Sequence, residues 1–345
     1  MNPVSQTLSE RSSRNKRIEY IDLLRSIAIF LVIYGHVDVQ LLWHDNSSKI
    51  AYFFSLIHMP LFFFISGYFM YSEEYTKQLV KKRIINRLVY QLYPTIIFFV
   101  LYVLTVIGKS PIDYLFTIYK AGYWFTFVSI EISLIILPLL YVFTRTSLCR
   151  QRRSTILFLL TIIAFLAYSC LKGINERNTH DICVLLSIGL VLKYIPFVLL
   201  GCLFRINKDL IINKYFIPSY WWITFSLFIV SVLIRNSVSN MLLGITSIAM
   251  LFYLSSKIPI SFFDSNIGKI LSFCGQRTLE IYLLHYFIIA LLGRLKFVSF
   301  LSKYCGSLFE FPIYAAIAFF ILTCCLFFYE ALKYCKIDTF IFPKR

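Results

Sequence analysis

Long apolar runs alternate with short polar segments along the whole chain. From this pattern we predict ten membrane-spanning helices, at residues 21–42, 52–71, 88–107, 123–143, 154–171, 183–204, 218–234, 238–256, 274–293 and 311–332. A helix needs about 20 mainly apolar residues to cross a hydrocarbon layer of about 30 Å. The strands of a transmembrane barrel would instead show short segments of alternating polarity. The pattern therefore predicts an all-α, polytopic integral membrane protein.

The composition agrees with this class, and the charge adds an orientation. Hydrophobic residues make up 59% of the chain, and its mean hydropathy is +0.75. A net charge of +17 could indicate a nucleic-acid partner. With ten spans, however, 23 of the 34 lysines and arginines fall on the side of the two termini and nine on the other. Because cytoplasmic loops are enriched in basic residues, we expect both termini in the cytoplasm and no nucleic-acid partner.

We expect one membrane-embedded domain at residues 18–336, flanked by two cytoplasmic tails. Residues 1–17 are polar and basic and are predicted to be disordered, and residues 337–345 form the second tail. The first apolar run exceeds the core of a signal peptide and lacks a small-residue cleavage site, so we expect it to remain as a span. The nine cysteines lack the spacing of metal ligands, and we predict no metal site.

Ionisable residues line one face of the first predicted span. Arg25 and His36 are eleven residues apart, which is three helical turns plus about 20°, and Asp22 precedes Arg25 by one turn. His36 lies about 16 Å beyond Arg25 along the helix. A charge near the middle of a spanning helix costs about 2.5–3.5 kcal/mol on an insertion scale. A function is therefore the default interpretation of this stripe.

His58, in the second predicted span, reaches about the same depth as His36 from the opposite direction. If the two spans are neighbours, both histidines can reach one group. A near-neutral pKa suits an imidazole to take a proton from a hydroxyl. An interhelical hydrogen bond without catalysis is the structural alternative for each of them.

Arg83 and Arg87 are four residues apart and share a helical face at the predicted cytoplasmic boundary before the third span. Two guanidinium groups on one face can bind phosphate oxygens bidentately. The alternative is that the two arginines only anchor the cytoplasmic end of the span by their positive charge. This explanation is sufficient for Lys77, Lys81 and Lys82.

Three further positions stay open between function and packing. Glu131, in the fourth span near the level of the two histidines, could orient an imidazole or bind a sugar hydroxyl, or could be a protonated structural hydrogen-bond donor. Trp124 fits an interfacial aromatic belt better than a sugar-stacking role. His285 lies in the inner half of the ninth span, where packing is the favoured interpretation.

Several segments, in order along the chain, match those of a known family. They are Arg25 and His36 with ten residues between them, HMPLFFFISGYF at 58–69, the basic cluster 82–87 leading into Tyr93 and Pro94, Tyr123–Trp124–Phe125, and IYLLH at 281–285. Over essentially its whole length the chain resembles membrane-bound acyltransferase family 3, the sugar O-acetyltransferases of bacterial envelopes. Within that family it looks most similar to the fucose O-acetylase-like branch.

The resemblance implies transfer of an acetyl or similar short acyl group to a hydroxyl of a cell-envelope saccharide or lipid-linked glycan. It implies acetyl-CoA or another acyl-CoA as co-substrate, no bound cofactor, and a place in the bacterial inner membrane among its lipids. The expected catalytic residues are His36, His58 and Glu131. The expected donor-binding residues are Arg25, Arg83 and Arg87, supported by Asp22, Trp124 and His285.

Two other classes of function are compatible with a polytopic chain. A transporter or flippase of a lipid-linked sugar often has duplicated halves, and no duplication is visible here. A non-catalytic sensor or scaffold would use the histidines only to join helices.

Overall fold

The computed structural model describes residues 3–42, 48–146, 148–171, 182–207, 218–234, 237–295 and 309–343. The side chains of residues 3–18, 218–221 and 237–238 are not described. The described residues are predominantly helical and include no strand. This confirms the prediction of an all-α polytopic membrane protein.

Among the described residues, eight helical stretches are long and apolar enough to cross a membrane, and each corresponds to a predicted span. They are Glu19–Leu41, Lys49–Met70, Lys77–Ile107, Trp124–Arg145, Arg150–Leu171, Ile182–Ile206, Ser239–Lys257 and Glu310–Tyr334. The predicted spans at 218–234 and 274–293 correspond to shorter apolar helices, Trp222–Leu233 and Thr278–Leu292. Arg150–Leu171 is largely unburied, and large side chains such as Ile163 and Leu166 are each 59% exposed on it. Apolar exposure of this extent suits contact with lipid rather than water.

The chain divides into two compact units. Unit 1 comprises residues 1–59, 218–235 and 239–327, and unit 2 comprises residues 60–217, 236–238 and 328–345. Two helices, α2 (Lys49–Met70) and α17 (Glu310–Tyr334), contribute residues to both units.

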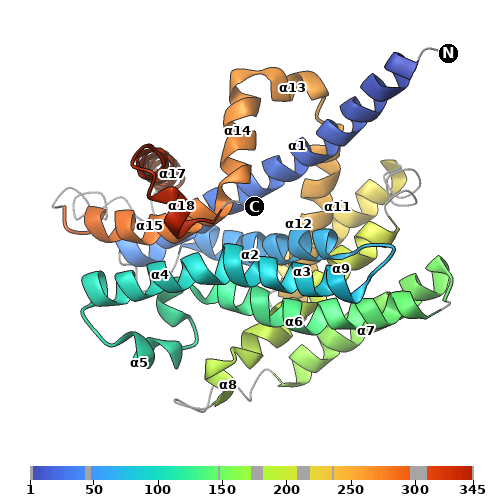
Figure 1. Cartoon of the computed structure of the whole chain (residues 1–345), viewed down its shortest axis with the longest axis horizontal. Coiled ribbons are helices and arrows are strands. Elements are labelled where there is room, and N and C mark those ends of the chain that lie inside the picture. Colours follow the sequence, from blue (N-terminus) through green and yellow to red (C-terminus); the bar gives the residue numbers. More distant parts are fainter. Residues whose placement is uncertain are drawn as a thin grey trace. The chain divides into compact units, whose positions relative to one another are not determined.

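Unit 1 is organised around α1 (Pro3–His36), which continues as the π-helical turn η1 (Val37–Leu41). The other helices of this unit are α11 (Pro218–Leu233), α12 (Ser237–Lys257), α13 (Ile260–Asp264), α14 (Asn266–Gln276) and α15 (Thr278–Leu292). Helices α14 and α15 both pack against α1, and α14 crosses it closely (Figure 1). Leu24, Ala28, Ile29 and Ile33 of α1 have no exposed surface. The first span is therefore the buried centre of its unit.

Unit 2 contains the long stretch α3 (Lys77–Arg87), η2 (Leu88–Leu92), α4 (Tyr93–Tyr102) and η3 (Val103–Ile107). It continues with α5 (Pro111–Leu115), η4 (Lys120–Gly122), α6 (Trp124–Arg145), α7 (Arg150–Leu171), α8 (Ile182–Leu185), α9 (Ile188–Ile206) and, near the C-terminus, α18 (Asp338–Ile341). Helix α9 packs along α7 and α6 (Figure 1). It also meets α2 at Gly67, where a Cβ would lie 1.9 Å from the Val198 carbonyl oxygen.

Several boundaries differ from the sequence-based prediction. Residues 77–87, which lie outside the predicted spans, are helical and continuous with the third span. The ninth span starts at Thr278 rather than residue 274, because Arg277 has non-helical dihedral angles and separates α14 from α15. The backbone of residues 3–17, assigned to a disordered tail, is helical, and the second tail contains α18.

Candidate functional site

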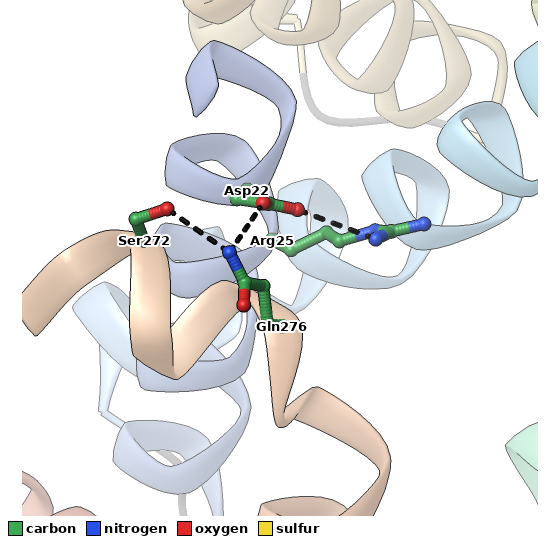
Figure 2. Close-up of polar contacts among 4 residues, drawn as sticks. All are labelled: Asp22, Arg25, Ser272 and Gln276. Carbon is green, nitrogen blue, oxygen red and sulfur yellow. Dashed lines mark hydrogen bonds and ion pairs between the residues drawn. The ribbon is translucent and has the colours of Figure 1, made fainter. Parts of the chain in front are cut away.

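The polar stripe on α1 begins with an ion pair that a second helix supports. Arg25 Nη1 lies 3.4 Å from Asp22 Oδ1. From α14, Gln276 Nε2 donates a hydrogen bond to Asp22 Oδ2 at 3.2 Å and lies 3.4 Å from Ser272 Oγ (Figure 2). Asp22 is buried, whereas about a third of the Arg25 side chain is exposed. The guanidinium is thus fixed at one end by a carboxylate and accessible over part of its surface.

A glycine allows the two helices to approach closely enough for this contact. A Cβ on Gly275 would lie 1.9 Å from the Asp22 carbonyl oxygen, so a larger residue would force α14 away from α1. The Asp22–Gln276 hydrogen bond therefore depends on the residue next to Gln276. Gln276 could not be predicted as a partner of Asp22, since nothing in the sequence indicates that α14 covers this part of the first span.

His36 is the last residue of α1 and directly precedes the π-helical turn η1. Its Nε2 lies 3.0 Å from the Tyr286 hydroxyl of α15, and its ring centroid is 5.2 Å from that of His285. His36 is half-buried, and His285 has no exposed surface. Two imidazoles and a phenol thus form one cluster inside unit 1, which we call the His–Tyr cluster.

The His–Tyr cluster forms because α1 and α15 run in the same direction. Gln276 contacts Asp22 at one end, and Tyr286 contacts His36 further along both segments. Counting from the predicted span ends had placed His285 in the inner half of the membrane, below His36. The structure brings the two rings to a centroid separation of 5.2 Å. Tyr286 was missed, although its position directly after His285 on an apolar helix was a usable signal.

His58 lies beside α1 at the level of the His–Tyr cluster. Its Cε1 is 3.9 Å from the position that a Cβ would take on Gly35, the residue before His36. The imidazole is largely buried. The structure therefore brings the second span to the end of the first span, as the similar depths of the two histidines led us to expect. Whether His58 takes part in chemistry stays a prediction.

In unit 2, Arg83 and Arg87 both join α3 to neighbouring segments. Arg83 Nη1 donates hydrogen bonds to the Met70 carbonyl oxygen and, at 2.6 Å, to the Tyr75 hydroxyl. Burial raises the pKa of Tyr75, and the positive charge of Arg83 opposes that rise. The phenol is therefore neutral, and Arg83 stabilises the turn between α2 and α3.

Arg87 binds two helices through hydroxyl groups. Its Nη2 donates to Ser66 Oγ of α2 at 3.0 Å, and its Nη1 donates to Ser129 Oγ of α6 at 3.1 Å. Like His36, Arg87 ends an α-helix that continues as a π-helical turn, here η2. Single π-helical turns are rare and frequent at functional sites. The hydrogen bonds to α2 and α6 separate Arg87 from a cation that only marks the membrane boundary.

Glu131 of α6 lies near a buried lysine, Lys120, in the segment before the fourth predicted span. Lys120 is only 1% exposed, and its Nζ donates a hydrogen bond to the Val184 carbonyl oxygen at 3.0 Å. Burial lowers the pKa of Lys120, while the charge of Glu131 opposes that shift. The Glu131 Oε2 atom is buried without a hydrogen-bond partner among the described residues. The pair forms a second polar centre, which lies wholly within unit 2.

Trp124, at the start of α6, belongs to an aromatic stack. Its ring lies over Tyr194 of α9 with centroids 5.4 Å apart, and Tyr194 in turn stacks on Phe63 of α2 at 4.5 Å. Tyr119, which is largely exposed, meets Trp124 edge to face. The stack joins three helices, and its outer part is accessible.

Comparison with known proteins identifies one matching family. The family is acyltransferase family 3, described as an acyltransferase domain. Its model matches residues 18–330. No curated protein and no solved structure matches the chain. The matched range contains the polar stripe, the His–Tyr cluster, the two arginines and the Lys120–Glu131 pair.

Proposed function

The chain belongs to membrane acyltransferase family 3, and on this premise we propose that it transfers an acetyl or similar short acyl group from an acyl-CoA to a hydroxyl of a cell-envelope saccharide. Acyltransferase activity in a membrane follows from the family. The donor, the acetyl group, the saccharide acceptor and a location in a bacterial inner membrane are the further steps of the proposal.

The observation that supports a mechanism is the hydrogen bond between His36 and Tyr286. A half-buried imidazole with one nitrogen fixed by a phenol has a defined orientation, as a general base requires. In the proposed reaction, His36 accepts the proton of the acceptor hydroxyl while the hydroxyl oxygen attacks the thioester carbonyl carbon. The tetrahedral intermediate then collapses as the carbon–sulfur bond breaks. The imidazolium returns the proton to the departing CoA thiolate.

The proposal gives Arg25 the role of holding the donor. Arg25 and His36 lie on one side of α1, separated by about 16 Å of helix. An acyl-CoA has anionic phosphates at one end and its thioester at the other end of an extended arm. Arg25, held by Asp22 and Gln276, would bind the phosphate-bearing part, and His36 would meet the acyl end. Arg83 and Arg87, in unit 2, are separate candidates for binding acyl-CoA phosphates.

The remaining predicted residues take supporting roles in this proposal. His58, next to Gly35, and His285, against His36, would limit the positions open to the His36 ring and keep water away from the thioester. Within unit 2, Glu131 is the candidate to accept a hydrogen bond from a sugar hydroxyl. Trp124 would offer a flat apolar surface to a sugar ring.

The test is glycan analysis in cells of the source organism. Envelope glycans from a deletion strain, and from strains restored with the wild type or with His36→Ala, would be compared by mass spectrometry. We expect an acyl substituent to vanish on deletion, return with the wild type, and stay absent with His36→Ala at equal membrane abundance. Unchanged glycans in the deletion strain would contradict the saccharide acceptor. Restored acylation by His36→Ala would contradict the assigned base.

A further inference from the structure

An open groove of about 360 Å³ lies between α3 and α6 on the surface of unit 2. Its walls are apolar side chains from both helices, and two lysines of α3 complete it. The lining residues are Lys77, Val80, Lys81, Ile84, Ile85, Pro138 and Tyr141. We call this surface the α3–α6 groove. None of the proposed catalytic or donor-binding residues lines it.

The lysines of the groove carry charge that the protein itself does not neutralise. Lys77 and Lys81 are both exposed, and no carboxylate among the described residues lies within ion-pair distance of either. They occupy the first two turns of α3, where no acidic residue is present in the first turn. The start of a helix carries a partial positive charge, so cations there are unfavourable without an anion. The side chain of Thr76 caps only the Leu79 N–H group.

The arginines of the same helix form hydrogen bonds outside the groove. Arg83 bonds Met70 and Tyr75, and Arg87 bonds Ser66 and Ser129. The basic residues of α3 thus fall into two sets, arginines that join helices and lysines that line the groove. Positive charge for membrane orientation alone would not require this division.

We propose that the α3–α6 groove binds one anionic phospholipid, with an acyl chain along its apolar wall and the headgroup phosphate at Lys77 and Lys81. The stretch Lys77–Ile107 is apolar enough to cross a membrane and begins at these lysines, so the groove lies where headgroups are expected. The apolar side chains that line it suit a hydrocarbon chain, whereas the polar ring and ribose of a nucleotide would lose hydrogen bonds there. A lysine near an anionic surface contributes roughly a fivefold gain in affinity.

The experiment is lipid titration of the purified, delipidated full-length protein, followed by native mass spectrometry. Dioleoyl phosphatidylglycerol is the probe, and dioleoyl phosphatidylcholine is the neutral comparison. We expect the wild type to bind dioleoyl phosphatidylglycerol more tightly than dioleoyl phosphatidylcholine. Lys77→Gln/Lys81→Gln should weaken its binding roughly tenfold or more. The matched control, Lys82→Gln/Lys269→Gln, removes two exposed lysines that do not line the groove and should change the affinity less than twofold.

A second variant tests the apolar wall without changing charge. Ile84→Trp fills the groove and should displace the lipid, provided that its thermal unfolding matches the wild type. Equal binding of the two lipids, or equal loss in both lysine pairs, would overturn the proposal. So would displacement of the lipid by free CoA, because the lysines would then belong to donor binding. None of these outcomes depends on acyl transfer.

Discussion

The Tyr286 hydroxyl lies 3.0 Å from Nε2 of His36, so the last residue of α1 is joined to the middle of α15. Tyr286 is 1% exposed, and its ring lies 4.0 Å, centroid to centroid, from that of His285. The phenol is therefore packed on one side and bonded at its tip. It contacts His36 through Nε2, one of the two ring nitrogens.

Replacing Tyr286 with Phe should lower the rate of acyl transfer about three- to tenfold, because a neutral hydrogen bond contributes about 0.5–1.5 kcal/mol. The measurement is kcat across a pH series with the purified protein in vesicles. We expect the acidic limb of the profile to move as well, since the imidazole loses a partner. A purely structural role would lower kcat without moving the limb.

Tyr34→Phe is the matched control for that experiment. Tyr34 is also a buried tyrosine, on the same helix as His36, and its hydroxyl has no hydrogen-bond partner among the described residues. Loss of this hydroxyl should leave both kcat and the pH profile unchanged. An equal effect in the two variants would show that His36 does not depend on Tyr286.

Arg25→Gln should have two effects that a second substitution separates. It leaves the buried Asp22 carboxylate without its cation, at a cost of about 1 kcal/mol given the partial exposure of Arg25. Asp22→Asn/Arg25→Gln removes the uncompensated charge and should recover most of the thermal stability. The KM for acyl-CoA should stay raised in both variants. Recovery of KM together with stability would mean that Arg25 does not bind the donor.

Gly67→Ala should destabilise unit 2, because the added Cβ would lie 1.9 Å from the Val198 carbonyl oxygen. Overpacking of this kind costs about 1–3 kcal/mol. The apparent Tm of the purified protein is the measurement. Gly293→Ala is the control, since the nearest atom to its Cβ would be the Ile289 carbonyl oxygen at 3.5 Å. A normal Tm for Gly67→Ala would contradict the close approach of α2 and α9.

Lys120 should make thermal stability depend on alkaline pH. Burial lowers its pKa from 10.5 in the folded state. Between the lowered pKa and 10.5 the unfolded chain binds more protons, so stability rises with pH in that interval. Apparent Tm values measured up to pH 10.5 should therefore rise more in the wild type than in Lys120→Met. Parallel curves would show that Lys120 is not buried as described.

The fold class could be predicted from the sequence because apolar runs of spanning length leave few alternatives. The stripe on α1 was also predictable, since helical periodicity alone places Asp22, Arg25 and His36 on one side. The partners of that stripe were not predictable. Gln276 and Tyr286 lie some 250 positions along the chain from Asp22 and His36. Only the packing of α14 and α15 on α1 brings them into contact.

The lysine at position 120 shows a different limit of sequence reasoning. A charged residue in a short polar segment between apolar runs is usually exposed, and nothing local distinguishes Lys120 from Lys109. The structure buries Lys120 through left-handed backbone at Lys120 and Ala121 and through the Val184 carbonyl oxygen. The hydrogen bond to Val184 is a tertiary contact with α8, which no periodicity reveals.

The proposed role of His36 is that of proton acceptor in acyl transfer. Its direct test is transfer of labelled acetyl from acetyl-CoA to extracted envelope glycan by the purified full-length protein in vesicles. General base catalysis contributes about 10²–10⁴-fold, so His36→Ala should lower kcat by at least about a hundredfold while acetyl-CoA binding and Tm stay close to those of the wild type. A kcat within a few-fold of the wild type would contradict the account.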